Sequence, residues 1–309
     1  MDDDNRNKAS QAETSGVSLV ERAAREIERR AGDDTQVCPG QETPDAKTNA
    51  HRPTAQTPPV ESRAHSPVVP IDRDKLKAFG ALTPDDLRSE LAEEMRLVKR
   101  ALIRRMMESA RPHRNLVQVT SAWPEEGKSF LAVNLAISLA SEMDYNVLLI
   151  DADVHRAAVV KVLGIETEKG ILDVIRDPEM DLSEVIVRTD MERLSVIGPG
   201  KSDPLSTERL SSQRMSAVTA ELAERYNDRI IIFDTSPLLA TSEPGVMAQL
   251  MGQVIIVVEA DRTTRQAIDQ ALEQLPEDCP AGMVLNKSKG LVGGSALPYY
   301  GYYGYYNTK

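Results

Sequence analysis

The chain has 309 residues, of which 41% are hydrophobic and 4% aromatic, and its formal net charge is −11. This length allows one large domain or two small ones with a sizeable core, and the acidic balance argues against a nucleic-acid-binding surface. Its apolar runs are far shorter than the roughly 20 residues of a membrane-spanning helix, and the acidic start, Met1 to Asp4, is unlike an export signal. The sequence therefore predicts a cytoplasmic protein.

Residues 1–31 are predicted to form a tail with one short helix. Ser18 followed by Glu21 is a capping-box pattern, and apolar residues from Leu19 to Ile27 recur at helical spacing. Two interpretations stay open: a nascent helix in an unfolded tail, or a docking helix that folds on a partner. Residues 32–80 are predicted to be a disordered linker, because 32–70 are rich in Pro, Thr, Gln, Asp and Glu and poor in large apolar residues.

A helix is predicted from Thr83 to about Ala110. Thr83-Pro84-Asp85-Asp86 combines an N-cap, a proline at the first helical position and an acidic first turn. Within this helix Glu93, Arg96 and Lys99 recur at a spacing of three, which puts them on one helix face. From periodicity alone this face is either exposed, with ion pairs within the helix, or an intersubunit seam.

From Pro112 onwards, short β-branched runs alternate with helical segments in the predicted domain 81–289. The runs are near-continuously apolar, as expected for strands that are buried on both faces. The predicted strands are Leu116–Thr120, Val147–Ile150, Leu194–Ile197, Ile230–Phe233, Val254–Val258 and Met283–Leu285. Because most gaps leave room for a crossover helix, the sequence predicts an α/β fold with a doubly wound, mainly parallel sheet.

A phosphate-loop pattern directly follows the first of these strands. It reads Thr120-Ser121-Ala122-Trp123-Pro124-Glu125-Glu126-Gly127-Lys128-Ser129, and a helical stretch follows to Ala140. In this order backbone N–H groups converge on phosphates, Lys128 reaches the β and γ oxygens, and the Ser129 hydroxyl can bind Mg²⁺. The loop is a deviant Walker motif, since Ala122 replaces a glycine and two glutamates must point outward. The predicted nucleotide-binding residues are Glu126, Gly127, Lys128, Ser129 and Phe130.

Three aspartates stand at the ends of two other predicted strands. Asp151 and Asp153 follow one strand, and Asp234 ends another. Carboxyl ends of parallel strands meet at one edge of a sheet, where a carboxylate can hold Mg²⁺, often through water. An aspartate that caps the next turn is the alternative interpretation. We expect Ser129, Asp153 and Asp234 to be the metal-binding residues of a phosphoryl-transfer site that uses ATP and Mg²⁺.

These motifs resemble those of the bacterial tyrosine kinases with a P-loop fold. The resemblance runs from about Asp85 to the C-terminus and includes the phosphate loop, the aspartate motifs, residues 284–288 and the terminal tyrosines. The chain is similar to the cytoplasmic autokinases of exosortase-associated exopolysaccharide gene clusters, whose N-terminal helix corresponds to residues 18–23. It departs from the family at Glu125, where glycine is usual, and at His155-Arg156-Ala157, where Arg-Arg-Pro or similar is usual.

The resemblance implies an ATP- and Mg²⁺-dependent protein-tyrosine autokinase. Its catalytic residues would be Lys128, Asp151 and Asp153. Either Asp151 or Asp153 would orient or deprotonate a tyrosine hydroxyl, and the choice between them stays open. Glu93, Arg96 and Lys99 resemble the family's Glu-x-x-Arg-x-x-Arg oligomerisation motif, which implies a seam in a ring-like homo-oligomer.

Residues 290–309 are predicted to form a flexible, tyrosine-rich tail. Its repeat holds six of the eight tyrosines of the chain: Tyr299, Tyr300, Tyr302, Tyr303, Tyr305 and Tyr306. A Tyr/Gly repeat favours weak self-association, so an adhesive tail is one interpretation. Next to a phosphoryl-transfer site, the favoured interpretation is that the tyrosines are phosphorylation sites.

The resemblance also implies a cellular role and a partner. We expect the kinase to regulate exopolysaccharide biosynthesis or export through an integral membrane chain-length or export activator, which would hold the cytoplasmic chain peripherally at the inner membrane. No nucleic acid is expected. The alternatives are a partitioning or positioning P-loop ATPase, which usually has a second lysine early in the loop, and a nucleotide-binding scaffold with weak activity. Residues 122–126 contain no lysine.

Overall fold

The computed structural model describes residues 68–85 and 88–288. These residues belong to one compact unit of the chain, 61–309. The predicted docking helix, most of the predicted linker and the tyrosine tail lie outside the described residues.

An eight-stranded sheet forms the centre of the fold, in the order β1-β4-β5-β3-β6-β2-β7-β8. All neighbouring strands are parallel except β4 and β5, which are antiparallel. The strands are β1 (Val68–Val69), β2 (Leu116–Ser121), β3 (Asn146–Asp151), β4 (Val187–Thr189), β5 (Leu194–Ile197), β6 (Arg229–Asp234), β7 (Gln253–Glu259) and β8 (Ala281–Asn286). The mainly parallel α/β sheet is confirmed, and so are all six predicted strands.

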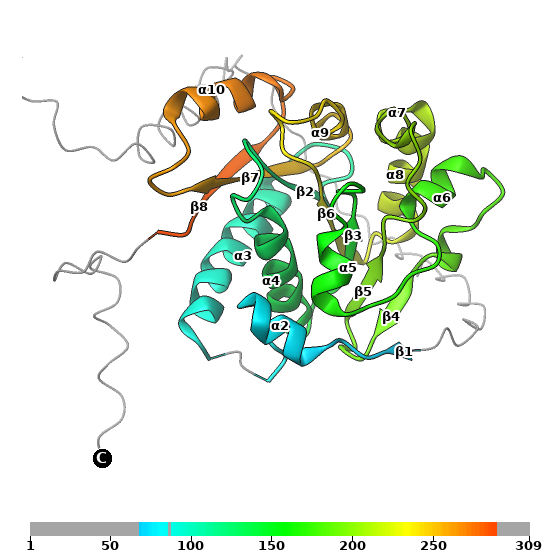
Figure 1. Cartoon of the computed structure of the whole chain (residues 1–309), viewed down its shortest axis with the longest axis horizontal. Coiled ribbons are helices and arrows are strands. Elements are labelled where there is room, and N and C mark those ends of the chain that lie inside the picture. The colour runs from blue at the N-terminus through cyan, green and yellow to red at the C-terminus, as the bar shows by residue number, and fades with distance from the viewer. Residues whose placement is uncertain (1–67, 86–87, 289–309) are drawn as a thin grey trace, which may run out of the picture. The chain divides into compact units, whose positions relative to one another are not determined.

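Helices pack on both faces of this sheet (Figure 1). They are α2 (Arg73–Phe79), α3 (Glu90–Glu108), α4 (Lys128–Ala140), α5 (Ala158–Leu163), α6 (Ile171–Arg176), α7 (Ser206–Leu210), α8 (Gln213–Arg225), α9 (Glu243–Ala248) and α10 (Arg265–Glu273), with a 3-10 turn at Leu182–Glu184. Successive strand residues serve opposite faces: Leu149 packs in the core with α3 and α4, and Leu148 in the core with α6 and α8. A smaller cluster joins β7 to α10.

Residues 68–80 are folded, which corrects the C-terminal part of the predicted linker. Asp72 caps α2 by accepting hydrogen bonds from the Asp74 and Lys75 N–H groups, and Gly80 ends the helix with a φ of 73°. Leu76 is fully buried. The linker was predicted from the composition of 32–70, and this helix lies just beyond that stretch, where packing against distant segments stabilises it. β1 and β4 were not predicted either, since two or three residues are too few to show a periodicity.

The predicted start of the next helix at Thr83 is wrong. α3 begins at Glu90, with Ser89 as its N-cap. Residues 81–83 are instead held against α4, because the Leu82 N–H donates to Asn134 Oδ1 at 2.7 Å and Thr83 is buried. The helix ends at Glu108, within two residues of the predicted end.

Candidate active site

The strand order brings the predicted site residues together. β6 lies between β3 and β2, so Asp151 is in register with Asp234, and Asp234 with Val119. The phosphate loop leaves β2 at this same edge and leads into α4. Three segments that are distant in the sequence thus end at one place, as expected for an open parallel sheet.

The loop ends in a glycine that the site requires. Gly127 is the N-cap of α4, with a φ of 101°. A Cβ here would lie 1.9 Å from Asn286 Nδ2, so only glycine fits. No side chain caps the N-terminus of α4. Its first N–H groups are therefore available to an anion, as a phosphate site requires.

The two glutamates of the loop have different surroundings. Glu126 is buried, and its carboxylate accepts hydrogen bonds from the Trp123 N–H at 2.8 Å and from the Thr263 hydroxyl. Its side chain therefore stabilises the loop, although it was predicted among the nucleotide-binding residues. The Glu125 side chain is exposed, 3.9 Å from the Arg156 guanidinium, on a backbone with a φ of 72°. The Glu126 carboxylate is thus held within the loop, and the Glu125 carboxylate lies beside the Arg156 guanidinium.

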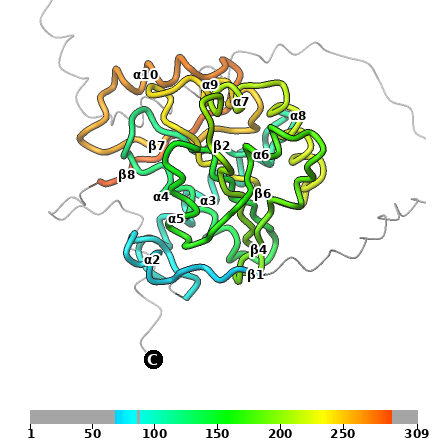
Figure 2. The backbone as a smooth tube through the Cα atoms, turned by 45° about the vertical axis from the view of Figure 1, so that its right-hand side comes forward, coloured from blue at the N-terminus to red at the C-terminus, as the bar shows by residue number. Residues whose placement is uncertain are grey.

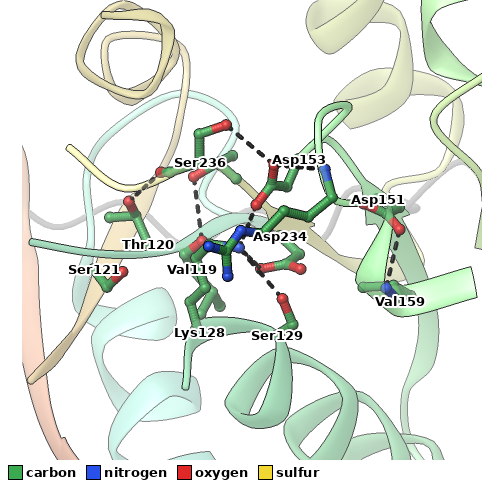
Figure 3. Close-up of polar contacts among 12 residues, drawn as sticks. Val119, Thr120, Ser121, Lys128, Ser129, Asp151, Asp153, Val159, Asp234 and Ser236 are labelled. Carbon is green, nitrogen blue, oxygen red and sulfur yellow. Dashed lines mark hydrogen bonds and ion pairs between the residues drawn. The ribbon is translucent and has the colours of Figure 1, made fainter. Parts of the chain in front are cut away.

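Lys128 is buried among the aspartates (Figure 3). Its Nζ donates to Asp153 Oδ2 at 2.5 Å and to Ser129 Oγ at 3.3 Å, and it lies 3.7 Å from Asp234 Oδ1. Burial lowers the pKa of Lys128, but the charges of Asp234 and Asp153 outweigh this effect and leave the pKa raised. The lysine is therefore a permanent cation at the sheet edge.

The three aspartates have different partners. Asp151 Oδ2 accepts hydrogen bonds from the Val159 and Val160 N–H groups at the start of α5, and its Oδ1 has no partner. Asp153 Oδ1 accepts from the Arg156 N–H and the Ser236 hydroxyl. Asp151 thus caps a helix, which was the alternative interpretation for these residues, whereas Asp153 contacts the lysine.

Burial changes the protonation of two of these aspartates. It raises the pKa of Asp151, and the negative charge of Asp234 raises it further. Burial also raises the pKa of Asp234, while the Lys128 charge opposes this shift. Both oxygens of Asp234 are buried without a hydrogen-bond partner.

The donor set fits Mg²⁺ shared with a nucleotide. The buried Asp234 carboxylate lies beside the Ser129 hydroxyl and the lysine, and Mg²⁺ prefers oxygen ligands. Within the described residues, no group of three or more His, Cys, Asp or Glu side chains could hold a metal ion by itself. In phosphoryl-transfer sites, phosphates and water usually supply most of the Mg²⁺ ligands.

A pocket of about 470 Å³ opens beside the loop. Its lining consists of Phe79, Glu125, Gly127, Lys128, Ser129, Phe130, Arg156, Ala158, Asn286 and Lys287. Of the predicted nucleotide-binding residues, four line this pocket, and Glu126 does not.

Two polar residues at the end of the last strand, β8, were not predicted as site residues. Asn286 Nδ2 donates to the Glu126 carbonyl at 2.9 Å, and Lys287 Nζ donates to the Glu125 carbonyl at 2.6 Å. Both residues therefore hold the loop through its backbone carbonyl groups. The signal was present in the sequence, since an apolar strand leads into both residues, but it gave no sign that β8 lies beside β7, which in turn borders the strand that precedes the loop.

The predicted oligomerisation residues do not share one exposed face. Arg96 pairs with Glu93 within α3, and Glu93 is exposed. Lys99 is buried: its Nζ donates to the Ser138 carbonyl at 3.1 Å and pairs with Glu142, at the end of α4. The prediction that Lys99 faces a neighbouring subunit is therefore wrong. Arg100 is exposed.

Comparisons with known proteins agree with this geometry. A family described as an AAA domain matches residues 126–277. The chain is 31% identical to the tyrosine-protein kinase ptk of Acinetobacter johnsonii, over 65% of this chain and 26% of ptk. It is 29% identical to the tyrosine-protein kinase YwqD of Bacillus subtilis, over 73% of this chain and 89% of YwqD. The kinase domain of Escherichia coli Etk aligns in three dimensions with a TM-score of 0.55 and 28% identity, over 65% of this chain and 78% of that domain.

The chain is similar to bacterial tyrosine kinases in both sequence and fold. The BceF tyrosine kinase domain also aligns with it, with a TM-score of 0.57 and 26% identity over 71% of this chain and 90% of that domain. The chain spans about a quarter of the length of ptk and 89% of YwqD. The predicted family resemblance is therefore confirmed. Among the described residues, no helix has the length and apolar character to cross a membrane.

Proposed function

We propose that this protein is an ATP- and Mg²⁺-dependent protein-tyrosine autokinase that phosphorylates its C-terminal tyrosines. The observation that carries the proposal is the contact of Lys128 with Asp153 and Asp234 at the uncapped N-terminus of α4. Phosphoryl transfer needs a positioned cation, a metal-binding carboxylate and free amides more than it needs covalent chemistry. This edge of the sheet offers all three.

The residues divide these tasks according to their contacts. Lys128 would hold the β and γ phosphates, and Ser129 and Asp234 would hold Mg²⁺, which neutralises phosphate charge when bound. In the reaction the phenol oxygen bonds to the γ-phosphorus, the bond from that phosphorus to the bridging oxygen breaks, and ADP leaves. Asp153 would orient the hydroxyl or accept its proton, because it lies against Lys128, whereas Asp151 is engaged with α5.

The cellular role rests on the family resemblance. We propose that the kinase forms a ring-like homo-oligomer and regulates exopolysaccharide biosynthesis or export. An integral membrane chain-length or export activator would recruit it to the inner membrane through residues 1–31. Residues 32–67 would act as the linker, and 290–309 as the phosphorylated tail.

Incubation of the full chain with γ-labelled ATP and Mg²⁺ tests the proposal. We expect label on tyrosine in the wild type and no label on Lys128→Met, because that variant loses the cation that neutralises the transferred phosphoryl group. Lys169→Met is the control: it removes a lysine that lies outside the pocket and pairs with Glu184 at the surface. Circular dichroism of each variant confirms folding.

Other results would favour the alternatives. ATP hydrolysis without labelled tyrosine would favour a P-loop ATPase, and nucleotide binding with neither reaction would favour a scaffold. Full labelling of a folded Lys128→Met variant would remove this loop as the catalytic site.

A further inference from the structure

The segment 68–83, which we name the strap, precedes the catalytic core in sequence and is tied to it at three points. The Ile71 N–H donates to Asp190 Oδ1 at 3.0 Å, and the Asp72 N–H to the Leu163 carbonyl at 2.9 Å. At its far end the Leu82 N–H donates to Asn134 Oδ1 in α4. Figure 2 shows α2, the helix of the strap, beside α5. The strap is thus fixed in place on the core.

The helix of the strap ends at a phenylalanine, Phe79, that is not fully buried. Phe79 is 38% exposed, although Leu76, one turn earlier, is completely buried. Its ring lies 5.9 Å from the ring of Phe130, at an interplanar angle of 49°. Phe130 directly follows Ser129 of the phosphate loop. The strap therefore places an accessible aromatic pair next to the loop.

The same pair lines the pocket described above. The pocket includes Gly127, Lys128 and Ser129, but Asp151, Asp153 and Asp234 do not line it. It therefore reaches from Lys128 and Ser129, which would hold the phosphates and Mg²⁺, to the aromatic pair. The part of a nucleotide on that side of its phosphates is the ribose and the base. Asn286 and Lys287 also line this part of the pocket.

We propose that Phe79 is a base-binding residue: together with Phe130 it forms an aromatic wall that contacts the base of the bound nucleotide. The proposal rests on the proposed function, because it requires nucleotide at this loop. Aromatic rings contact bases favourably, since every base presents an apolar, polarisable face. The strap lies outside residues 126–277, the part that matches the AAA domain family. Residues that precede the catalytic core would thus complete its nucleotide site.

A comparison of ligands with and without a base tests this role. The full chain is titrated with ATP, ADP and inorganic triphosphate in Mg²⁺ by calorimetry, and Trp123, the single tryptophan, gives a second signal from within the loop. We expect Phe79→Ala and Phe79→Leu to weaken ATP and ADP binding by about tenfold, the lower range for loss of one base–aromatic contact. Triphosphate binding should stay within twofold of wild type. Phe79→Trp should restore ATP affinity.

Two controls separate this role from a structural one. Met143→Ala removes a more exposed apolar side chain beyond the other end of α4 and should change no affinity. Hydrogen exchange of the α2 amides should slow with ADP in the wild type but not with triphosphate. Equal losses of ATP and triphosphate affinity in folded Phe79→Ala would overturn the proposal, as would unchanged ATP affinity. Unchanged ATP affinity with a raised KM for a tyrosine peptide would mean that the aromatic wall contacts the tyrosine ring of the protein substrate and not the base.

These outcomes are distinct from failure of the proposed function. If neither the wild type nor any variant binds ATP, the nucleotide site itself is wrong. If ATP binds and depends on Lys128 but not on Phe79, only the base-binding role is lost.

Discussion

The carboxyl group of Asp151 is fully buried. It accepts hydrogen bonds from two backbone N–H groups and from no side chain. Burial, reinforced by the charge of Asp234, raises its pKa to about 8. In the folded protein this group therefore keeps its proton at pH values at which the unfolded chain has lost it. The free energy of unfolding contributed by Asp151 is fully present below about pH 4 and is lost as the pH rises through the folded pKa.

Because the contribution of Asp151 to stability is lost as the pH rises, Asp151→Asn should change the pH dependence of stability. The amide can still accept the hydrogen bonds from α5, but it carries no charge at high pH. We expect the variant to match the wild type near pH 4 and to be more stable by more than about 1.4 kcal/mol at pH 8.5, since the pKa is raised by more than one unit and each unit corresponds to about 1.4 kcal/mol. Thermal unfolding of the apoprotein between pH 4 and 9 measures this.

Asp144→Asn provides the control at an exposed position. It should leave the pH dependence of stability unchanged. A stabilisation by Asp151→Asn that is equal at pH 4 and pH 8.5 would contradict the proposed cause.

At the scale of one element, two neighbouring cations of α3 have different surroundings. Lys99 reaches across to the C-terminal end of α4, where carbonyl groups at a helix end favour a cation. Its neighbour Arg100 is exposed. The two residues are adjacent and similar in charge, so they form a matched pair for experiment.

We predict different effects for the two alanine variants. Lys99→Ala should lower the free energy of unfolding by about 1 to 2 kcal/mol, because it leaves a buried carbonyl without its donor. Arg100→Ala should leave stability within about 0.5 kcal/mol, as expected at an exposed position. If α3 forms the proposed oligomer interface, Arg100→Ala should shift sedimentation towards monomer.

Urea unfolding and sedimentation velocity of both variants measure these effects. Equal stability losses would mean that Arg100 also belongs to the protomer core. A dissociating but fully stable Lys99→Ala variant would return Lys99 to the subunit interface.

At the scale of the whole molecule, the proposed kinase must bring its tail tyrosines to the phosphate loop. A tail held near a neighbour's site in an oligomer would react at a high effective concentration. We therefore predict phosphorylation in trans. A Lys128→Met chain with an intact tail should acquire label when it is mixed with an active chain whose six tail tyrosines are Phe.

Mass spectrometry of the separated chains gives the result. Each protein incubated alone serves as the control and should show no label on the tail. If the Lys128→Met tail stays unlabelled in the mixture although the wild type labels its own tail, transfer is in cis, and the oligomer is not needed for catalysis.

The sequence by itself determined the sheet and most of the site. The six predicted strands are contiguous apolar runs, a local signal that survives folding because both faces of a parallel sheet are buried. Lys128, Ser129 and the aspartates were found for a related reason: the carboxyl ends of parallel strands share one edge, so strand ends indicate a common site before any contact is known.

Only the tertiary structure decided which polar residues face that site and which serve packing. Lys99, Glu126 and Asp151 have the residue types of functional groups, yet Lys99 is held by α4, Glu126 by Thr263 and Asp151 by α5. Their partners lie 8 to 137 residues away in sequence. The strap and Phe79 were missed for the same reason, because α2 is stable only where distant segments cover Leu76. Periodicity shows which residues share one face of a helix or strand. Whether that face is buried by a distant segment decides whether its side chains serve packing or the site.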